Sequence, residues 1–145
     1  MNASAPSERS VRAVWRTGWV VDIACGDFAL TADEPSTVPG GTDQGPQPTE
    51  LLLAAVSSCF AMALSHAARK RSVEIDGLVV EATGYYEGPS FSAIRVTAVV
   101  GCDESQLAGL MSSAERFCYV TNTLRGGVDL TFEGILGPPV GGGDS

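Results

Sequence analysis

Two cysteines offer the clearest chemistry in this sequence. Cys59 lies in the apolar stretch ELLLAAVSSCFAMALSHAARK, residues 50–70, and Cys118 lies in AERFCYVTNTLRGG, residues 114–127. A thiol that reduces a peroxide must ionise, and a second thiol must capture the sulfenic acid that forms on it. The two thiols can join only if their Cα atoms come within about 4.4–6.8 Å. A free cysteine considered alone is more commonly an unreactive, buried core residue. Two interpretations therefore stay open at this point: a reactive thiol pair, or two unreactive core residues.

Ionisation of Cys59 requires a cation from another part of the chain, because the dipole of its helix acts only within the terminal turn. Arg16 is the first candidate and Arg12 the second, and Arg125 follows the second predicted helix. A guanidinium over a buried thiol is costly unless it is paired, and Glu50 or another carboxylate could pair with it.

The remaining chemistry-bearing residues are predicted to be structural. His66 is seven residues from Cys59, about 10 Å along a helix, which is too far for a hydrogen bond. We interpret His66 as a partly buried residue near the helix end. Cys25 and Cys102 are interpreted as inert. With one histidine and no CxxC spacing, the sequence predicts no metal site.

Composition limits the class of protein. The chain has 145 residues, a net charge of −8 and a pI near 4.4. The length fits one domain, and the acidity argues against nucleic acid and anionic membranes as partners. The apolar run 51–64 is shorter than the ~20 residues that span a bilayer, and residues 1–16 lack the apolar region of a signal peptide. We therefore expect a soluble cytoplasmic protein, with residues 10–136 as its single domain and disordered tails at 1–9 and 137–145.

The pattern of residues predicts an α+β fold. Two or three strands are expected in 10–33, and a long Pro- and Gly-rich loop follows at 34–48. A helix is expected at 48–71, followed by a hairpin formed by 77–88 and 91–100. A second helix should begin at about 103 and end in NTLRGG, and a last strand should cover 127–136. The long loop predicts a functional or partner-binding surface. The first helix is apolar on every side between Leu51 and Leu64, so we expect a second chain to help cover it.

Residues 40–67 and 114–134 resemble the two cysteine motifs of the OsmC/Ohr family of organic hydroperoxide reductases. The resemblance extends over nearly all of residues 10–136. It implies an α+β OsmC-like fold in which two chains intertwine as a homodimer. Two central helices would pack back to back, and antiparallel sheets would wrap around them.

The resemblance also implies a thiol-dependent peroxidase that acts in oxidative stress. Cys59 would attack the hydroperoxide and become a sulfenic acid, and Cys118 would then form a Cys59–Cys118 disulfide. An external dithiol of the lipoyl type would reopen that disulfide, and no cofactor is implied. Alkyl or fatty-acid hydroperoxides would suit the apolar lining formed by Leu52, Val56, Phe60 and Phe117.

Three positions depart from the family pattern. Thr49 occupies the place of the glutamate that pairs with the activating arginine, and Glu50 follows it. That arginine lies on the N-terminal strands, where Arg16 is its best match. Tyr119 replaces the proline after the second cysteine. These differences resemble broader OsmC-like branches and leave an alternative: an OsmC-fold small-molecule-binding or redox-sensing protein with little or no turnover.

Overall fold

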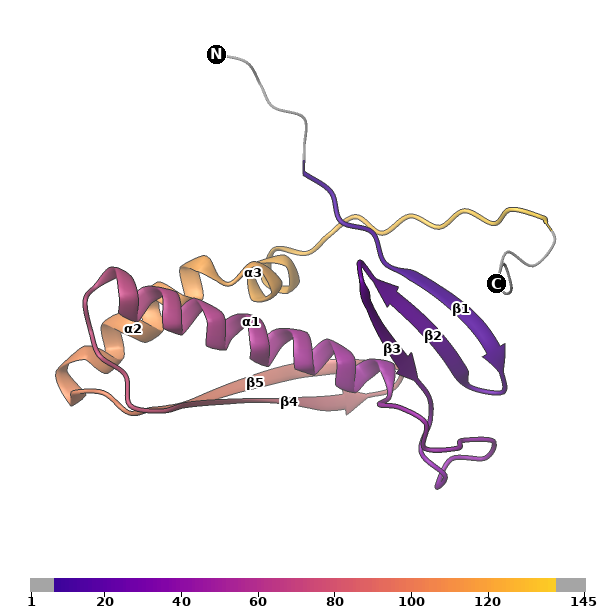
Figure 1. Cartoon of the computed structure of the whole chain (residues 1–145), viewed down its shortest axis with the longest axis horizontal. Helices are drawn as coiled ribbons and strands as arrows, with labels where there is room; N and C mark the ends of the chain where they lie inside the picture. Colours follow the sequence, from indigo (N-terminus) through magenta and orange to yellow (C-terminus); the bar gives the residue numbers. More distant parts are fainter. Residues whose placement is uncertain (1–6, 138–145) are drawn as a thin grey trace, which may run out of the picture. The chain divides into compact units, whose positions relative to one another are not determined.

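A computed structural model describes residues 7–137 of the chain. These residues form two compact units, one of residues 7–50 with 134–137 and one of residues 51–133. The elements in chain order are β1 (Arg12–Thr17), β2 (Val20–Cys25), β3 (Phe28–Ala32), α1 (Pro48–Lys70), β4 (Leu78–Glu87), β5 (Ser90–Val100), α2 (Glu104–Phe117) and α3 (Tyr119–Gly126) (Figure 1). The α+β class is confirmed. The parts of the predicted tails at 1–6 and 138–145 lie outside the described residues.

The first unit is built on an antiparallel sheet in the order β1-β2-β3. Ile23 in β2 stands between Ala13 of β1 and Leu30 of β3. Gly18 and Gly26 turn the chain between these strands with φ of 54° and 60°, values that a residue with a Cβ adopts at a cost. The predicted strands of residues 10–33 are therefore confirmed as three.

A buried carboxylate orders the loop between β3 and α1. Asp33 is 1% exposed and accepts hydrogen bonds from the backbone N–H groups of Glu34, Thr42 and Gln44 at 2.7, 3.2 and 3.1 Å, and from the Thr42 hydroxyl. The Thr42 hydroxyl bond, together with the backbone bonds, outweighs the burial of this carboxyl and holds the pKa of Asp33 below its ordinary value. The long loop is thus a folded structure that depends on one ionised side chain.

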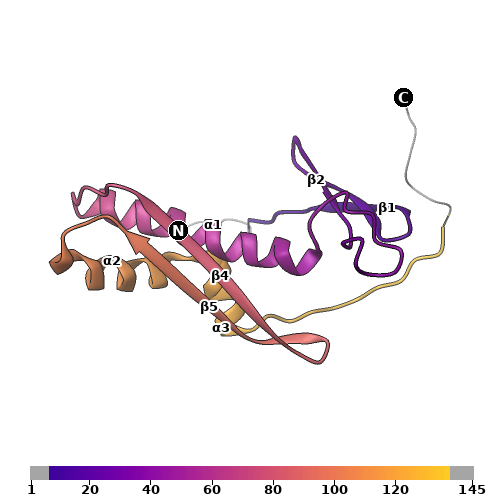
Figure 2. The ribbon, with the colours of Figure 1, turned by 90° about the horizontal axis from the view of Figure 1, so that it is seen from below.

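The second unit is built on the β4–β5 hairpin (Figure 2). Burial alternates along both strands, as expected for a hairpin with one covered face. Leu78 and Val80 of β4, and Val96 and Ala98 of β5, pack against the helical core, whereas Val79 is 58% exposed on the opposite face. The predicted hairpin is confirmed.

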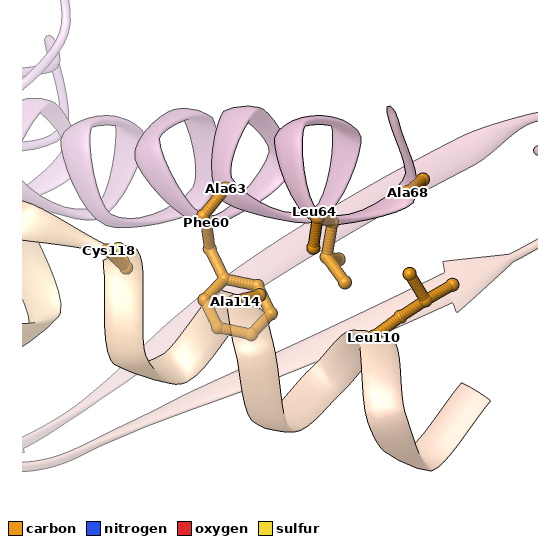
Figure 3. Packing of buried hydrophobic residues seen from close by; sticks show 8 residues of the cluster. Phe60, Ala63, Leu64, Ala68, Leu110, Ala114 and Cys118 are labelled. Carbon is orange, nitrogen blue, oxygen red and sulfur yellow. The ribbon is translucent and has the colours of Figure 1, made fainter. Parts of the chain in front are cut away.

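The core of this unit forms where α1 crosses α2 above the hairpin (Figure 3). Its buried members are Phe60, Ala63, Leu64, Ala67 and Ala68 from α1, Leu110 and Ala114 from α2, and Cys118. Side chains from both helices and from the hairpin meet in this cluster. The packing of the cluster sets the position of its members, including Cys118.

Helix α1 matches the predicted range of 48–71 to within one residue, and this chain encloses it only in part. By length and composition its 23 residues could cross a membrane, although the central apolar run alone was judged too short. In its most apolar window, 33% of the residues are buried within the fold. Val56, Phe60 and Leu64 are buried, whereas Leu52 and Met62 are 38% and 72% exposed. One side of α1 therefore serves as a core helix, and its exposed positions within the described chain combine the apolar Leu52 and Met62 with the polar Ser58 and His66.

The predicted last strand at 127–136 is wrong for the chain as described, since residues 127–137 have no strand structure. Val128, Leu130 and Phe132 alternate with polar residues, as in a strand, and are 63%, 73% and 92% exposed. Alternation marks a segment that can pair, but a strand forms only where another strand offers its edge. Within the described residues, no edge pairs with this segment.

Replacement of a core leucine tests the helix crossing. Leu110 is 0% exposed, so Leu110→Ala leaves a cavity between α1 and α2, and we expect a loss of roughly 2–5 kcal/mol in the free energy of unfolding. Leu107→Ala on the same helix is the matched control, because Leu107 is 39% exposed. Urea denaturation at one fixed protein concentration measures both. Equal losses in the two variants would contradict the assigned core.

The pKa of Asp33 makes stability depend on pH. Because the folded-state pKa is lowered, the ionised Asp33 stabilises the fold above its unfolded pKa, and this contribution disappears as the pH falls through the folded pKa. Asp33→Asn should therefore be less stable than wild type near neutral pH, and the difference should shrink below about pH 4. Urea denaturation across pH measures this difference, with Asp27→Asn at an exposed turn position as the control. A difference that stays constant down to pH 2 would contradict this account.

Candidate functional site

Cys59 occupies a partly exposed position on α1. It directly precedes the buried Phe60, and it packs against the core cluster that also contains Cys118. Helix α1 begins at Pro48, and the carboxylate of Glu50 in its first turn accepts a hydrogen bond from the Gln47 N–H at 3.0 Å. This bond stabilises the start of the helix. The thiol of Cys59 is therefore held by a long, rigid helix and is still in reach of a small molecule.

Cys118 lies at a break between α2 and α3, where the sequence predicted one continuous helix that ends in NTLRGG. Its φ and ψ of −80° and 104° are extended, so Cys118 ends α2 and serves as the N-cap of α3. The Cys118 N–H donates to the Ala114 carbonyl at 3.0 Å, and the Asn122 side chain donates to the Arg116 carbonyl at 3.0 Å. Because Asn122 satisfies a carbonyl that the break leaves free, the chain can turn here, and Cys118 faces α1 at 0% exposure (Figure 3).

The two thiols belong to one packed cluster, in which the partly exposed Cys59 packs against buried residues that include Cys118. Burial raises the pKa of the Cys118 thiol, but hydrogen bonding from Thr121, Cys59 and the Val120 N–H outweighs burial and leaves this pKa below the ordinary cysteine value. The Cys118 side chain makes no conventional cap hydrogen bond at the start of α3. The fold thus places both thiols in one cluster and favours the thiolate of Cys118.

An apolar cavity opens beside Cys59. This Cys59 cavity has a volume of about 360 Å³ and is lined by Cys59, Met62, Ala63, His66, Phe117 and Tyr119. The rings of His66 and Phe117 meet edge to face, with centroids 6.2 Å apart. Its volume falls within the range of small-molecule sites. A molecule with an apolar body could therefore reach the Cys59 sulfur from this cavity.

A second cavity lies on the hairpin side of the site. This Arg125 cavity has a volume of about 410 Å³, and its lining includes Val56, Phe91, Thr121, Leu124 and Arg125. Thr121 connects this cavity to the thiol pair, since it lines the wall and also bonds to Cys118. The ring of Phe91 covers Gly84 so closely that an added Cβ would lie 2.6 Å from the ring.

The four predicted lining residues are distributed over several places. Phe117 lies in the wall of the Cys59 cavity, whereas Val56 lines the Arg125 cavity. Phe60 is a core residue at 4% exposure and also lines a smaller cavity with Thr121. Leu52 is exposed on α1. Helix geometry explains why these residues lie in different places. Leu52, Val56 and Phe60 are spaced four residues apart along α1, so they extend past Cys59 toward the hairpin.

Arg16 is held by a carboxylate other than Glu50. A bulge between Trp15 and Thr17 interrupts the β1–β2 register at Arg16, and such bulges redirect side chains. Its guanidinium makes a bidentate pair with Asp22, with one N···O distance of 3.0 Å, and donates to the Gln44 side chain at 3.3 Å. The Asp22 hydrogen bond and charge raise the pKa of Arg16. Arg16 belongs to the first unit and Cys59 to the second, and its action on Cys59 stays a prediction.

The other two arginine candidates lie in different units. Arg12 is on β1, opposite Ala24 of β2. Arg125 is in the last turn of α3 and lines a cavity together with Thr121. Arg125 is therefore the candidate that shares a unit with both cysteines.

Cys25 and Cys102 have separate surroundings. Cys25 ends β2 in the first unit, and Cys102 packs beside the core just before α2. Among residues 7–137, no group of three histidine, cysteine or acidic side chains is arranged to hold a metal ion.

Sequence reasoning missed two features of the site. Thr121 and the N–H groups at the start of α3 could not be recognised, because an unbroken 3.6-residue periodicity hid the helix break at Cys118. His66 was expected to be partly buried, but it is exposed and shares the Cys59 cavity. The seven-residue spacing that excludes a hydrogen bond also places His66 and Cys59 on one face of α1, which was the available signal.

Comparisons with known proteins identify the family of this chain. The family model described as OsmC-like protein matches residues 41–133. The organic hydroperoxide resistance protein OhrB of Bacillus subtilis is 30% identical over 94 residues, which cover 61% of this chain and 69% of OhrB. The organic hydroperoxide resistance protein of Xanthomonas axonopodis pv. citri is 30% identical over 112 residues, covering 72% of this chain and 79% of that protein. The crystal structure of an OsmC-like protein from Mycoplasma pneumoniae superposes with a TM-score of 0.70 at 18% identity, covering 84% of this chain and 90% of that one, and so shows the shared fold. The chain belongs to the OsmC-like protein family.

Proposed function

We propose that this protein reduces organic hydroperoxides by thiol chemistry at Cys59 and Cys118. The observation that supports this proposal is that a partly exposed thiol in a cavity wall packs against the cluster that contains a buried thiol with a lowered pKa. A peroxidase that works through a disulfide needs this pair, since one thiol must meet the substrate and the other must capture the product. The names of the two relatives, both organic hydroperoxide resistance proteins, support the same chemistry.

The proposed cycle balances in three steps. The Cys59 thiolate attacks the terminal peroxide oxygen, the O–O bond breaks, and a Cys59 sulfenic acid and an alkoxide form, the latter taking a proton to become an alcohol. The Cys118 thiolate then attacks the Cys59 sulfur, and the hydroxyl leaves with a proton as water. Finally a dithiol, of lipoyl type or another, reduces the Cys59–Cys118 disulfide and is itself oxidised to a disulfide.

The Cys59 cavity favours hydroperoxides with an apolar body. Met62, Ala63 and Phe117 contribute apolar surface to its wall. Burial of apolar surface contributes about 25 cal/mol per Å², a gain that hydrogen peroxide cannot obtain. We therefore propose alkyl or fatty-acid hydroperoxides as substrates. A cytoplasmic location would supply the dithiol that such a cycle needs.

We further propose that the working protein is a homodimer. Met62 on α1 and Leu130 and Phe132 near the C-terminus are 72%, 73% and 92% exposed, which is a large apolar surface for a single chain. A second copy that covers α1 and pairs with residues 127–136 would bury this surface and supply the missing strand edge.

An alternative function is ligand binding or redox sensing with little turnover. Its specific support is that Glu50 bonds to the backbone at the start of its own helix while Arg16 pairs with Asp22. If no guanidinium reaches Cys59, its thiolate fraction at neutral pH stays small. Alkylation of Cys59 at increasing pH separates the functions, because a thiol that reacts only above about pH 8 favours a binding protein.

Direct oxidation tests the thiol pair. Diamide should convert the reduced protein into a form in which Cys59 and Cys118 are disulfide-linked within one chain, because both residues pack in the same core cluster. Alkylation under denaturing conditions followed by peptide mass analysis should then label Cys25 and Cys102 only. Disulfides that link either cysteine of the pair to Cys25 or Cys102 instead would contradict the arrangement.

Turnover tests the proposed reaction. With cumene hydroperoxide and a lipoyl dithiol, Cys59→Ser should lower the rate of peroxide loss by at least about two orders of magnitude, because the nucleophile is gone. Cys118→Ser should consume about one equivalent and accumulate a sulfenic acid that dimedone traps. Cys102→Ser is the control and should keep the wild-type rate. If wild type and Cys59→Ser lose peroxide equally slowly, the protein is not a peroxidase.

A further inference from the structure

We infer that the reducing dithiol attacks the sulfur of Cys59 and expels Cys118, so that the mixed disulfide forms on Cys59. This inference rests on the proposed Cys59–Cys118 disulfide and assigns the direction in which that disulfide opens. A disulfide offers two sulfurs, and the preferred attack is decided by access to each sulfur and by which one leaves more readily as a thiolate.

Access favours Cys59. Cys118 is 0% exposed, enclosed by α1, the end of α2 and the start of α3. Cys59 lies in the wall of a cavity of about 360 Å³, which a dithiol can enter as the hydroperoxide does. The cavity therefore gives an external thiolate access to the Cys59 sulfur.

The leaving group favours the same direction. Cys118 is the N-cap residue of α3, so its side chain lies at the helix end where the first N–H groups are free, and a departing thiolate gains from these donors and from the helix dipole. Hydrogen bonding from Thr121 and Val120 likewise lowers the pKa of Cys118. The Thr121 hydroxyl donates to the Cys118 carbonyl at 3.3 Å. A hydroxyl has one proton, and the charged sulfur is the stronger acceptor once Cys118 leaves.

The step balances in atoms and electrons. A reductant thiolate forms an S–S bond with Cys59 as the Cys59–Cys118 bond breaks, and Cys118 takes the electron pair as a thiolate. The second thiol of the reductant then attacks its own sulfur in the mixed disulfide. This releases Cys59 as a thiolate and closes the oxidised dithiol, and the two protons of the dithiol pass to the two cysteines or to solvent.

Trapping of the mixed disulfide tests the direction. Wild type oxidised with diamide is mixed briefly with 2-mercaptoethanol, quenched in acid, denatured and alkylated with N-ethylmaleimide. Peptide mass analysis should find mercaptoethanol on Cys59 and N-ethylmaleimide on Cys118. Mercaptoethanol on Cys118, or on both cysteines equally, would overturn the inference.

The two proposals fail in different ways. Diamide makes the disulfide without peroxide, so the two proposals are tested separately. If the protein does not reduce hydroperoxides but the adduct is on Cys59, the proposed function is wrong and this inference holds. If the protein reduces hydroperoxides but the adduct is on Cys118, the proposed function holds and this inference is wrong.

Thr121 is the positioning residue whose effect can be isolated. Thr121→Val removes the hydroxyl at nearly constant shape and should slow opening of the disulfide by dithiol roughly three- to tenfold, and Thr121→Ser should restore the rate. Thr123→Val on the same helix is the matched control, because the Thr123 hydroxyl donates to the Tyr119 carbonyl at 2.8 Å. Equal rates for Thr121→Val and Thr123→Val would show that the hydroxyl does not assist the leaving sulfur.

Discussion

The site depends on the packing of Cys59 and Cys118 in one core cluster, although the two residues are distant in the sequence. This packing is fixed where α1 meets α2, with Phe60, Ala63 and Ala114 buried in the same cluster. A core that is close-packed at this point leaves each thiol little freedom. The chemistry therefore depends on ordinary hydrophobic packing within the second unit.

The two thiols have unequal surroundings, which suits them to unequal roles. Cys118 is buried among backbone and hydroxyl donors, whereas Cys59 faces a cavity. A buried thiol with a lowered pKa is a good leaving group and a protected one, since peroxide cannot oxidise it easily. An accessible thiol beside it meets each external reactant in turn. The hydroperoxide and the reducing dithiol would then both react at the sulfur of Cys59.

The sequence predicted much of the fold because its signals are local. The GPS turn between two strand-like segments predicted the hairpin, and Pro48 with the following apolar run predicted α1. The break at Cys118 was not predictable, since it depends on the Asn122 side chain bonding to a carbonyl left free by the turn. The prediction of a strand at 127–136 was wrong for a different reason. The local pattern is that of a strand, but pairing requires the edge of another strand, which the described chain does not provide. Likewise, the pairing of Arg16 with Asp22 rather than Glu50 follows from a bulge in strand register.

The most direct test of this account is a crystal structure of the protein after reaction with one equivalent of an organic hydroperoxide. We expect continuous density between the sulfurs of Cys59 and Cys118 at the ~2.05 Å of a disulfide bond, with the crossing of α1 and α2 unchanged. Two separate sulfurs, with Cys59 unmodified or carrying extra oxygen atoms and Cys118 turned away from it, would contradict the claim that the fold joins these thiols for catalysis.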